Sequence, residues 1–198
     1  NKPMKRLSLY LFLILFTLQT PSQADDIRDF QIEGVSIGDS LLDYMSEEEI
    51  KENVGFVYED KKFTVSYYNK SSEVYDEVAI EYKSKDKTYK IHGVQGVIFF
   101  ENNIEGCYKK QDEVEKEISS MFDETKKKNW DILTNPSRAE GSTYKVISFD
   151  FNNGSRATIE CYHYSDAPQD DHLKISANSK ELTKYIDYTT AQERKTNN

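Results

Sequence analysis

The chain has 198 residues, with 35 acidic and 26 basic side chains and a formal net charge of −9 at neutral pH. A surface this acidic repels phosphate backbones and anionic lipid headgroups, and no basic stripe along the chain offsets it. The composition therefore argues against nucleic acid and against an anionic membrane surface as partners. The length suits one domain that is large enough to bury its own core.

The first 24 residues have the three regions of a cleavable signal peptide. Met4 is the natural start, two cations follow it, an apolar run covers residues 9–18, and Ser22 and Ala24 are small residues at the cleavage site. The apolar run is much shorter than the roughly 20 residues that a membrane-spanning helix needs. We therefore expect export to the periplasm or the extracellular medium, with no transmembrane segment in the mature chain.

Cleavage after residue 24 would leave 174 residues, and the net charge would fall to −12 because the segment holds three cations and no acid. We expect residues 25–188 to form a single globular domain. Residues 189–198 are polar, and we expect them to be a disordered tail.

The first half of this domain predicts two short helices followed by strands. Asp39 can cap a helix over 40–45, and Ser46 with Glu49 forms a capping box for a second helix that ends near Asn53. Aromatic and β-branched residues then predict strands at 62–68, 77–83, 88–92 and 97–100. Gly93 and Gly96 lie between the last two of these strands and interrupt them, as bulges would.

The second half predicts a longer helix followed by a hairpin. An apolar stripe predicts a helix over 112–128, and the lysines at 126–128 suit the negative end of its dipole. Alternating residues around a Gly-containing turn predict a hairpin of strands 143–151 and 156–164. A short strand at 173–176 and a final helix near 182–186 complete the domain.

This order of elements predicts an α+β fold: an antiparallel β-sheet of about six strands with helices packed on one face. It also resembles the β-lactamase inhibitor proteins, whose architecture repeats an α-βββ unit. Residues 79–82 (Ala-Ile-Glu-Tyr) and 158–161 (Thr-Ile-Glu-Cys) are a slight echo between the two halves. The resemblance would imply a duplicated unit, and a single unduplicated sheet fits the same pattern.

Cys107 and Cys161 are the two cysteines of the chain. In an oxidising compartment an even pair most simply forms a disulfide, and neither residue belongs to a C-x-x-C motif or a basic segment that would favour a reactive thiol. We expect a structural bond that joins the entry of the central helix to the hairpin, and so joins the two halves of the chain.

Ser40 lies in the tetrapeptide Gly-Asp-Ser-Leu, which resembles the nucleophile motif of the GDSL esterases and lipases. The resemblance implies Ser40 as nucleophile and a D-x-x-H motif as its acid and base. Here Gln169 occupies the Asp position before His172, and the family's G-x-N-D block is missing. The structural alternative is that Ser40 or Asp39 caps a helix.

A metal site is a second alternative. His163, Asp166, Asp170, Asp171 and His172 crowd one segment, and imidazole with carboxylate suits zinc or a similar ion. Their spacing matches no recognised zinc motif, and an acidic loop between two strands is more simply solvated. The sequence assigns no metal ligand, no cofactor-binding residue and no catalytic residue.

Tyrosine is abundant, with 14 residues, and it suits recognition surfaces because each side chain combines an apolar ring with a hydroxyl. It is equally a good strand former. Our leading hypothesis is an exported, non-enzymatic protein that binds another protein or a small molecule through a sheet whose strands carry Tyr67, Tyr68, Tyr82, Tyr89, Tyr144, Tyr162 and Tyr164.

Overall fold

The computed structural model describes residues 26–70, 72–122, 125–130, 132–134, 140–165 and 171–196, so the predicted signal peptide lies outside the described residues. Within them the helical elements are η1 (Ile27–Asp29), η2 (Leu41–Asp43), α2 (Glu47–Glu52), α3 (Ile104–Met121) and α4 (Lys180–Thr196). The strands are β1 (Gln31–Ile32), β2 (Val35–Ser36), β3 (Val54–Val57), β4 (Phe63–Tyr67), β5 (Glu77–Lys83), β6 (Ile91–Phe99), β7 (Lys126–Asn129), β8 (Leu133–Thr134), β9 (Thr143–Asp150), β10 (Arg156–His163) and β11 (His172–Asn178).

Nine of these strands form one antiparallel sheet, which confirms the α+β class with more strands than expected. Its order is β3-β4-β5-β6-β11-β10-β9-β7, and β8 also pairs with β9. Each half of the chain contributes one meander, and the last strands of the two meanders, β6 and β11, meet at the centre. The echoing tetrapeptides lie in β5 and β10, each one strand away from this centre. The first half contributes four strands to the sheet and the second half five, because β7 and β8 both pair with β9.

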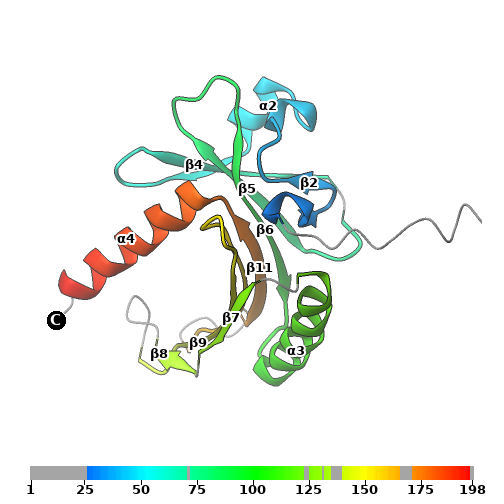
Figure 1. Ribbon diagram of the computed structural model, residues 1–198, viewed down its shortest axis with the longest axis vertical. Helices are drawn as coiled ribbons and strands as arrows, with labels where there is room; N and C mark the ends of the chain where they lie inside the picture. The colour runs from blue at the N-terminus through cyan, green and yellow to red at the C-terminus, as the bar shows by residue number, and fades with distance from the viewer. Residues whose placement is uncertain are drawn as a thin grey trace, which may run out of the picture.

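The two long helices lie on opposite sides of the sheet, which curves around α4 (Figure 1). Alternation along β10 shows the two faces. Arg156 bonds Asp187 of α4, whereas its neighbour Ala157 is buried in the cluster that holds Val114 and Ile118 of α3. We call these the α4 face and the α3 face. The expectation that all helices pack on one face was wrong for α4.

The placement of α4 follows from where apolar side chains emerge. Phe63 faces away from the α3 side, and its ring lies 5.1 Å from that of Tyr185. With Leu182 these two rings form a small buried cluster of their own. The large cluster lies on the α3 face, where the hydroxyl of Ser66 also donates to the Ile50 carbonyl of α2. Each long helix therefore buries its own apolar stripe on its own face.

Cys107 and Cys161 are bonded to each other, with a Cα–Cα distance of 6.0 Å, and both are fully buried. The predicted disulfide is confirmed, and it joins the entry of the central helix to the hairpin as expected. Helix α3 starts at Ile104, so Cys107 lies in its first turns and both cysteines belong to the second half of the chain. The bond therefore fastens α3 to the sheet and does not join the two halves.

The helix predicted over 112–128 begins and ends earlier. Asn103 caps α3 by accepting the amide of Gly106, a start that lies upstream of the apolar stripe. The lysine run is not the end of that helix but strand β7, paired with β9. Side chains alternate in direction along β7, so Lys127 bonds Glu115 on α3 and Lys128 bonds Asp150. Pairing with a distant strand thus overrides the helix propensity of lysine.

Strand β6 runs without interruption through both glycines, and its pairing with β11 has no register shift. A Cβ atom at Gly93 would lie 2.4 Å from Glu81 and 2.5 Å from Leu182, and one at Gly96 would lie 2.4 Å from the ring of Tyr75. Against β5, however, the register shifts by one residue between the pairs Glu81–Gly93 and Tyr82–Ile91, so a bulge does lie next to Gly93. Both glycines also allow close approach of side chains.

Helix α4 continues to Thr196, although we expected a disordered tail from residue 189. Ala191, Gln192, Glu193, Arg194 and Lys195 include several good helix formers, which favours continuation of the helix. No helix in the described part of the chain is long and apolar enough to span a bilayer.

Candidate binding face

An aromatic row crosses four neighbouring strands on the α4 face. Tyr144 pairs with Tyr162, Tyr162 with His172, and His172 with Phe99 in the strand register. The ring centroids of successive members lie 5.8, 5.0 and 6.0 Å apart, and Tyr164 packs against the middle of the row. We call Tyr144, Tyr162, His172 and Phe99 the aromatic ladder. Cross-strand aromatic pairs rigidify a sheet surface.

The ladder is accessible from solvent. Phe99 is 40% exposed, and the other three rings are half-buried. Trp130 lies opposite Val146, because its amide donates to the Val146 carbonyl, and Val146 pairs with Glu160 on the same face. Trp130 is 49% exposed. The α4 face thus presents exposed aromatic side chains beyond the part that α4 covers.

A charged pair, Glu160 and Lys174, lies directly beside the ladder. The ammonium donates to the carboxylate at 2.9 Å and to the hydroxyl of Tyr162 at 3.2 Å. The side chains of Glu160 and Lys174 are 13% and 26% exposed. Burial works most strongly against both charges, but the partner's charge and the surrounding hydrogen bonds together outweigh that penalty for each group. The pKa of Glu160 is accordingly lowered, and that of Lys174 is raised well above its ordinary value.

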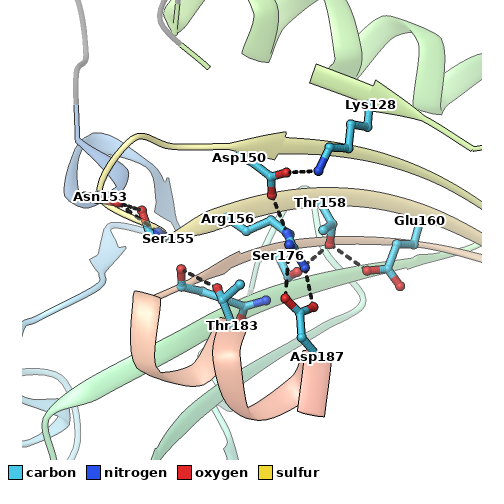
Figure 2. Close-up of polar contacts among 11 residues, drawn as sticks. Lys128, Asp150, Asn153, Ser155, Arg156, Thr158, Glu160, Ser176, Thr183 and Asp187 are labelled. Carbon is cyan, nitrogen blue, oxygen red and sulfur yellow. Dashed lines mark hydrogen bonds and ion pairs between the residues drawn. The ribbon is translucent and has the colours of Figure 1, made fainter. Parts of the chain in front are cut away.

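The carboxylate of Glu160 is fully hydrogen-bonded. Thr158 donates to one oxygen at 2.6 Å, while Tyr162 and Lys174 donate to the other. Thr158 in turn bonds the hydroxyl of Ser176 at 2.8 Å (Figure 2). Burial, and then the charge of Glu160, raise the pKa of Tyr162. These hydrogen bonds hold the Tyr162 side chain, which lies in the middle of the ladder.

Arg156 holds α4 against the sheet. Its guanidinium donates to Asp150 at 2.6 Å and to both oxygens of Asp187, at 2.7 and 3.3 Å (Figure 2). Lys128 reaches the other oxygen of Asp150 at 2.6 Å. Four strands or helices are linked in this way, and the position of α4 on the face is set by a bidentate Arg–carboxylate contact.

Glu81 is the counterpart of Glu160 in the first half, and it is more deeply buried, with 7% of its surface exposed. Its carboxyl accepts the hydroxyl of Tyr58 at 3.0 Å. Burial raises the pKa of Glu81, because the hydrogen bond from Tyr58 and the charge of Lys174 do not compensate for lost solvation. The two halves therefore hold one carboxyl whose pKa is raised and one whose pKa is lowered.

Ser40 acts as a helix cap. Its hydroxyl donates to the Thr88 carbonyl at 2.7 Å and accepts the amide of Leu42, at the start of η2. His92 contacts the hydroxyl of Ser179, and His163 contacts the carboxylate of Asp171, so both bond away from Ser40. The structure thus matches the alternative in which Ser40 caps a helix. Within the described part of the chain, the Ser40 hydroxyl bonds only backbone groups and contacts no His or carboxylate.

The predicted metal segment is divided between the two faces. His163 and Asp171 face each other on the α3 side with 2.7 Å between Nδ1 and Oδ1, whereas His172 belongs to the ladder on the α4 side. Asp166 and Asp170 lie outside the described residues. Among the residues that are described, no group of three His, Cys, Asp or Glu side chains could hold a metal ion.

Of the seven tyrosines predicted for the sheet, Tyr68, Tyr82 and Tyr89 are buried in the core, and Tyr67 is 39% exposed near the β3 edge. Tyr144, Tyr162 and Tyr164 lie together on the α4 face. Sequence reasoning missed Phe99, Trp130 and His172 as members of this face. The hairpin register could have placed Tyr144 beside Tyr162, but no local signal places Phe99 next to His172.

Chemically, the α4 face offers partly exposed aromatic rings that contact one another across four strands, beside a hydrogen-bonded ion pair. Comparisons of the chain with protein-family models, with curated proteins and with solved structures found no match.

Proposed function

We propose that this chain is an exported, non-enzymatic binding protein that docks a partner protein on the aromatic ladder and the neighbouring Trp130. The observation that carries the proposal is the in-register row of four rings on the face away from α3, with Phe99 and Trp130 still 40% and 49% exposed. The signal-peptide pattern and the buried disulfide support export.

The dimensions and composition of the face favour a protein partner over a small molecule. Four adjacent strands span about 14 Å at the usual strand spacing, which makes an extended platform. Tyrosine and tryptophan are the side chains that most often dominate protein interfaces, because they bury large area with few rotatable bonds. The hydrogen bonds of the Tyr162 hydroxyl with Glu160 and Lys174 hold its ring before binding, which reduces the entropy lost on docking.

The proposal can be tested without knowing the partner. A photoreactive benzoylphenylalanine is placed at Phe99 on the ladder or, as a control, at Met121 on α3, which is 41% exposed on the other face. Irradiation of producing cells should cross-link a discrete protein from position 99 and not from position 121.

The cross-linked protein is then purified and titrated with the disulfide-bonded chain. Replacing Phe99 and Trp130 together by alanine should weaken binding at least tenfold, while Met121→Ala leaves affinity unchanged. Equal cross-linking from both faces, or an unchanged affinity of the double variant, would show that the ladder is not the docking surface.

A further inference from the structure

Strand β3, at one end of the sheet, exposes an apolar edge. All four of its residues are exposed, and its large side chains, Val54, Phe56 and Val57, are 40%, 47% and 46% exposed. Phe56 lies opposite Val65 on the α4 face, whereas Val54 and Val57 lie on the α3 face. An added strand would therefore find apolar contacts on both of its faces.

The backbone of β3 also has hydrogen-bonding groups directed outward. The amide of Tyr58 donates to the Phe63 carbonyl, and the amide of Tyr67 donates to the Asn53 carbonyl, so Asn53 and Tyr58 are turned toward β4. Backbone groups alternate in direction on either side of the bulge between Val54 and Phe56, so Val54, next to Asn53, and Val57, next to Tyr58, are both turned away from β4. Their N–H and C=O groups form a short template for another chain.

The opposite edge of the same sheet differs in chemistry. Strand β7 is Lys-Lys-Lys-Asn, all four residues are exposed, and lysine side chains discourage edge pairing. The chain therefore protects one edge with charge and leaves the other apolar. An exposed apolar edge promotes aggregation of a monomer. The exposed apolar edge of β3 therefore indicates that another chain covers it when the protein functions.

Charge around β3 selects the covering chain. Residues 47–62 contain six carboxylates and three lysines, and the carboxylates lie on both sides of the strand in sequence, in α2 and in the turn after β3. Lys51 is already paired with Glu47 at 2.7 Å. A second copy of this acidic chain would bring like charges together, whereas a cationic segment would meet opposite charge.

We infer that β3 accepts an extended, positively charged peptide segment of another protein as an added antiparallel or parallel strand. Hydrogen bonds from Val54 and Val57 hold the segment, and alternate apolar side chains contact Phe56 on one face and the two valines on the other. This mode of binding is separate from docking on the aromatic ladder.

The test uses a phage-displayed library of random dodecapeptides selected on the folded, disulfide-bonded chain. Selected peptides should be rich in Lys or Arg and in alternating β-branched residues. Their synthetic forms should slow amide hydrogen exchange at Val57. Val57→Pro should weaken them at least tenfold, because it removes an outward N–H that is not part of the sheet, and Val57→Ala should weaken them less than threefold.

Val57→Lys serves as a second variant, since it gives β3 the chemistry of the β7 edge, and it should also weaken binding at least tenfold. Thermal melts establish that each variant is folded. Peptides that bind Val57→Pro and wild type equally, peptides that are acidic, or a library without binders would each overturn the inference. Dimerisation that Val57→Pro abolishes would overturn it in favour of a second copy of the chain.

Discussion

Replacing Lys174 by methionine should lower the free energy of unfolding by about 2–4 kcal/mol at pH 7. Methionine keeps the apolar stem but leaves the Glu160 carboxylate without its cation. Removing one partner of a buried ion pair costs about 3–5 kcal/mol, and the 26% exposure of Lys174 reduces this through solvent screening. Thr158 and Tyr162 still donate to the carboxylate, which limits the loss further.

The pH dependence identifies the cause. In the wild type the pKa of Glu160 is lowered, so its stabilisation is present above the unfolded-state pKa and is lost as pH falls through the folded-state value. In Lys174→Met, burial without a cation raises that pKa instead. The variant's deficit should therefore be largest near pH 7 and should shrink below about pH 4, where Glu160 is protonated in both proteins.

Urea unfolding monitored by the fluorescence of Trp130 measures the effect. Glu160→Gln and the double variant with Lys174→Met complete a double-mutant cycle, and we expect a coupling energy of about 2 kcal/mol between the two positions. A deficit below about 1 kcal/mol, or a deficit independent of pH, would refute the reasoning that the pair acts through buried charge.

Three further outcomes follow from other buried contacts. Replacing Cys107 and Cys161 by alanine should cost about 4 kcal/mol in urea unfolding, because the bond closes a loop of 54 residues. Glu81→Gln should raise Tm by about 3 °C at pH 8 and leave it unchanged at pH 4, because the raised pKa of Glu81 makes its ionisation destabilising as pH rises. Arg156→Ala should cost about 2 kcal/mol and speed amide exchange in α4 around Asp187, whereas Arg156→Lys should cost less; unchanged exchange would show that other contacts hold α4.

Local signals in the sequence were sufficient for much of the fold. The capping box of Ser46 and Glu49 forms as predicted, with both reciprocal hydrogen bonds present. The hairpin of β9 and β10 and the bonded cysteines were also predicted, since turn chemistry, alternation and cysteine pairing act over short or covalent links. Each of these features depends on contacts within a short segment or on a covalent bond, and not on how the rest of the chain folds.

The remaining differences arise from contacts between distant segments. The lysines of β7 become a strand only because β9 offers pairing on one side. The apolar residues of β3 are four in number and include a glycine, too short a pattern to predict a strand. The aromatic ladder depends on the pairing of β6 with β11, which sets His172 beside Phe99 across 73 residues and leaves no trace in either local sequence.

The central seam between β6 and β11 has a consequence for how the molecule opens. Strands within each meander are close in sequence, whereas this seam joins segments such as Val94 and Ala177, and no covalent link crosses it, because the disulfide lies within the second half. Closing such a distant pair costs loop entropy that local hairpins avoid. Of the two halves, only the second keeps a cross-link when the seam separates. We therefore expect the chain to behave as two cooperative units of unequal stability, in which the first meander unfolds before α3 and the strands of the second half.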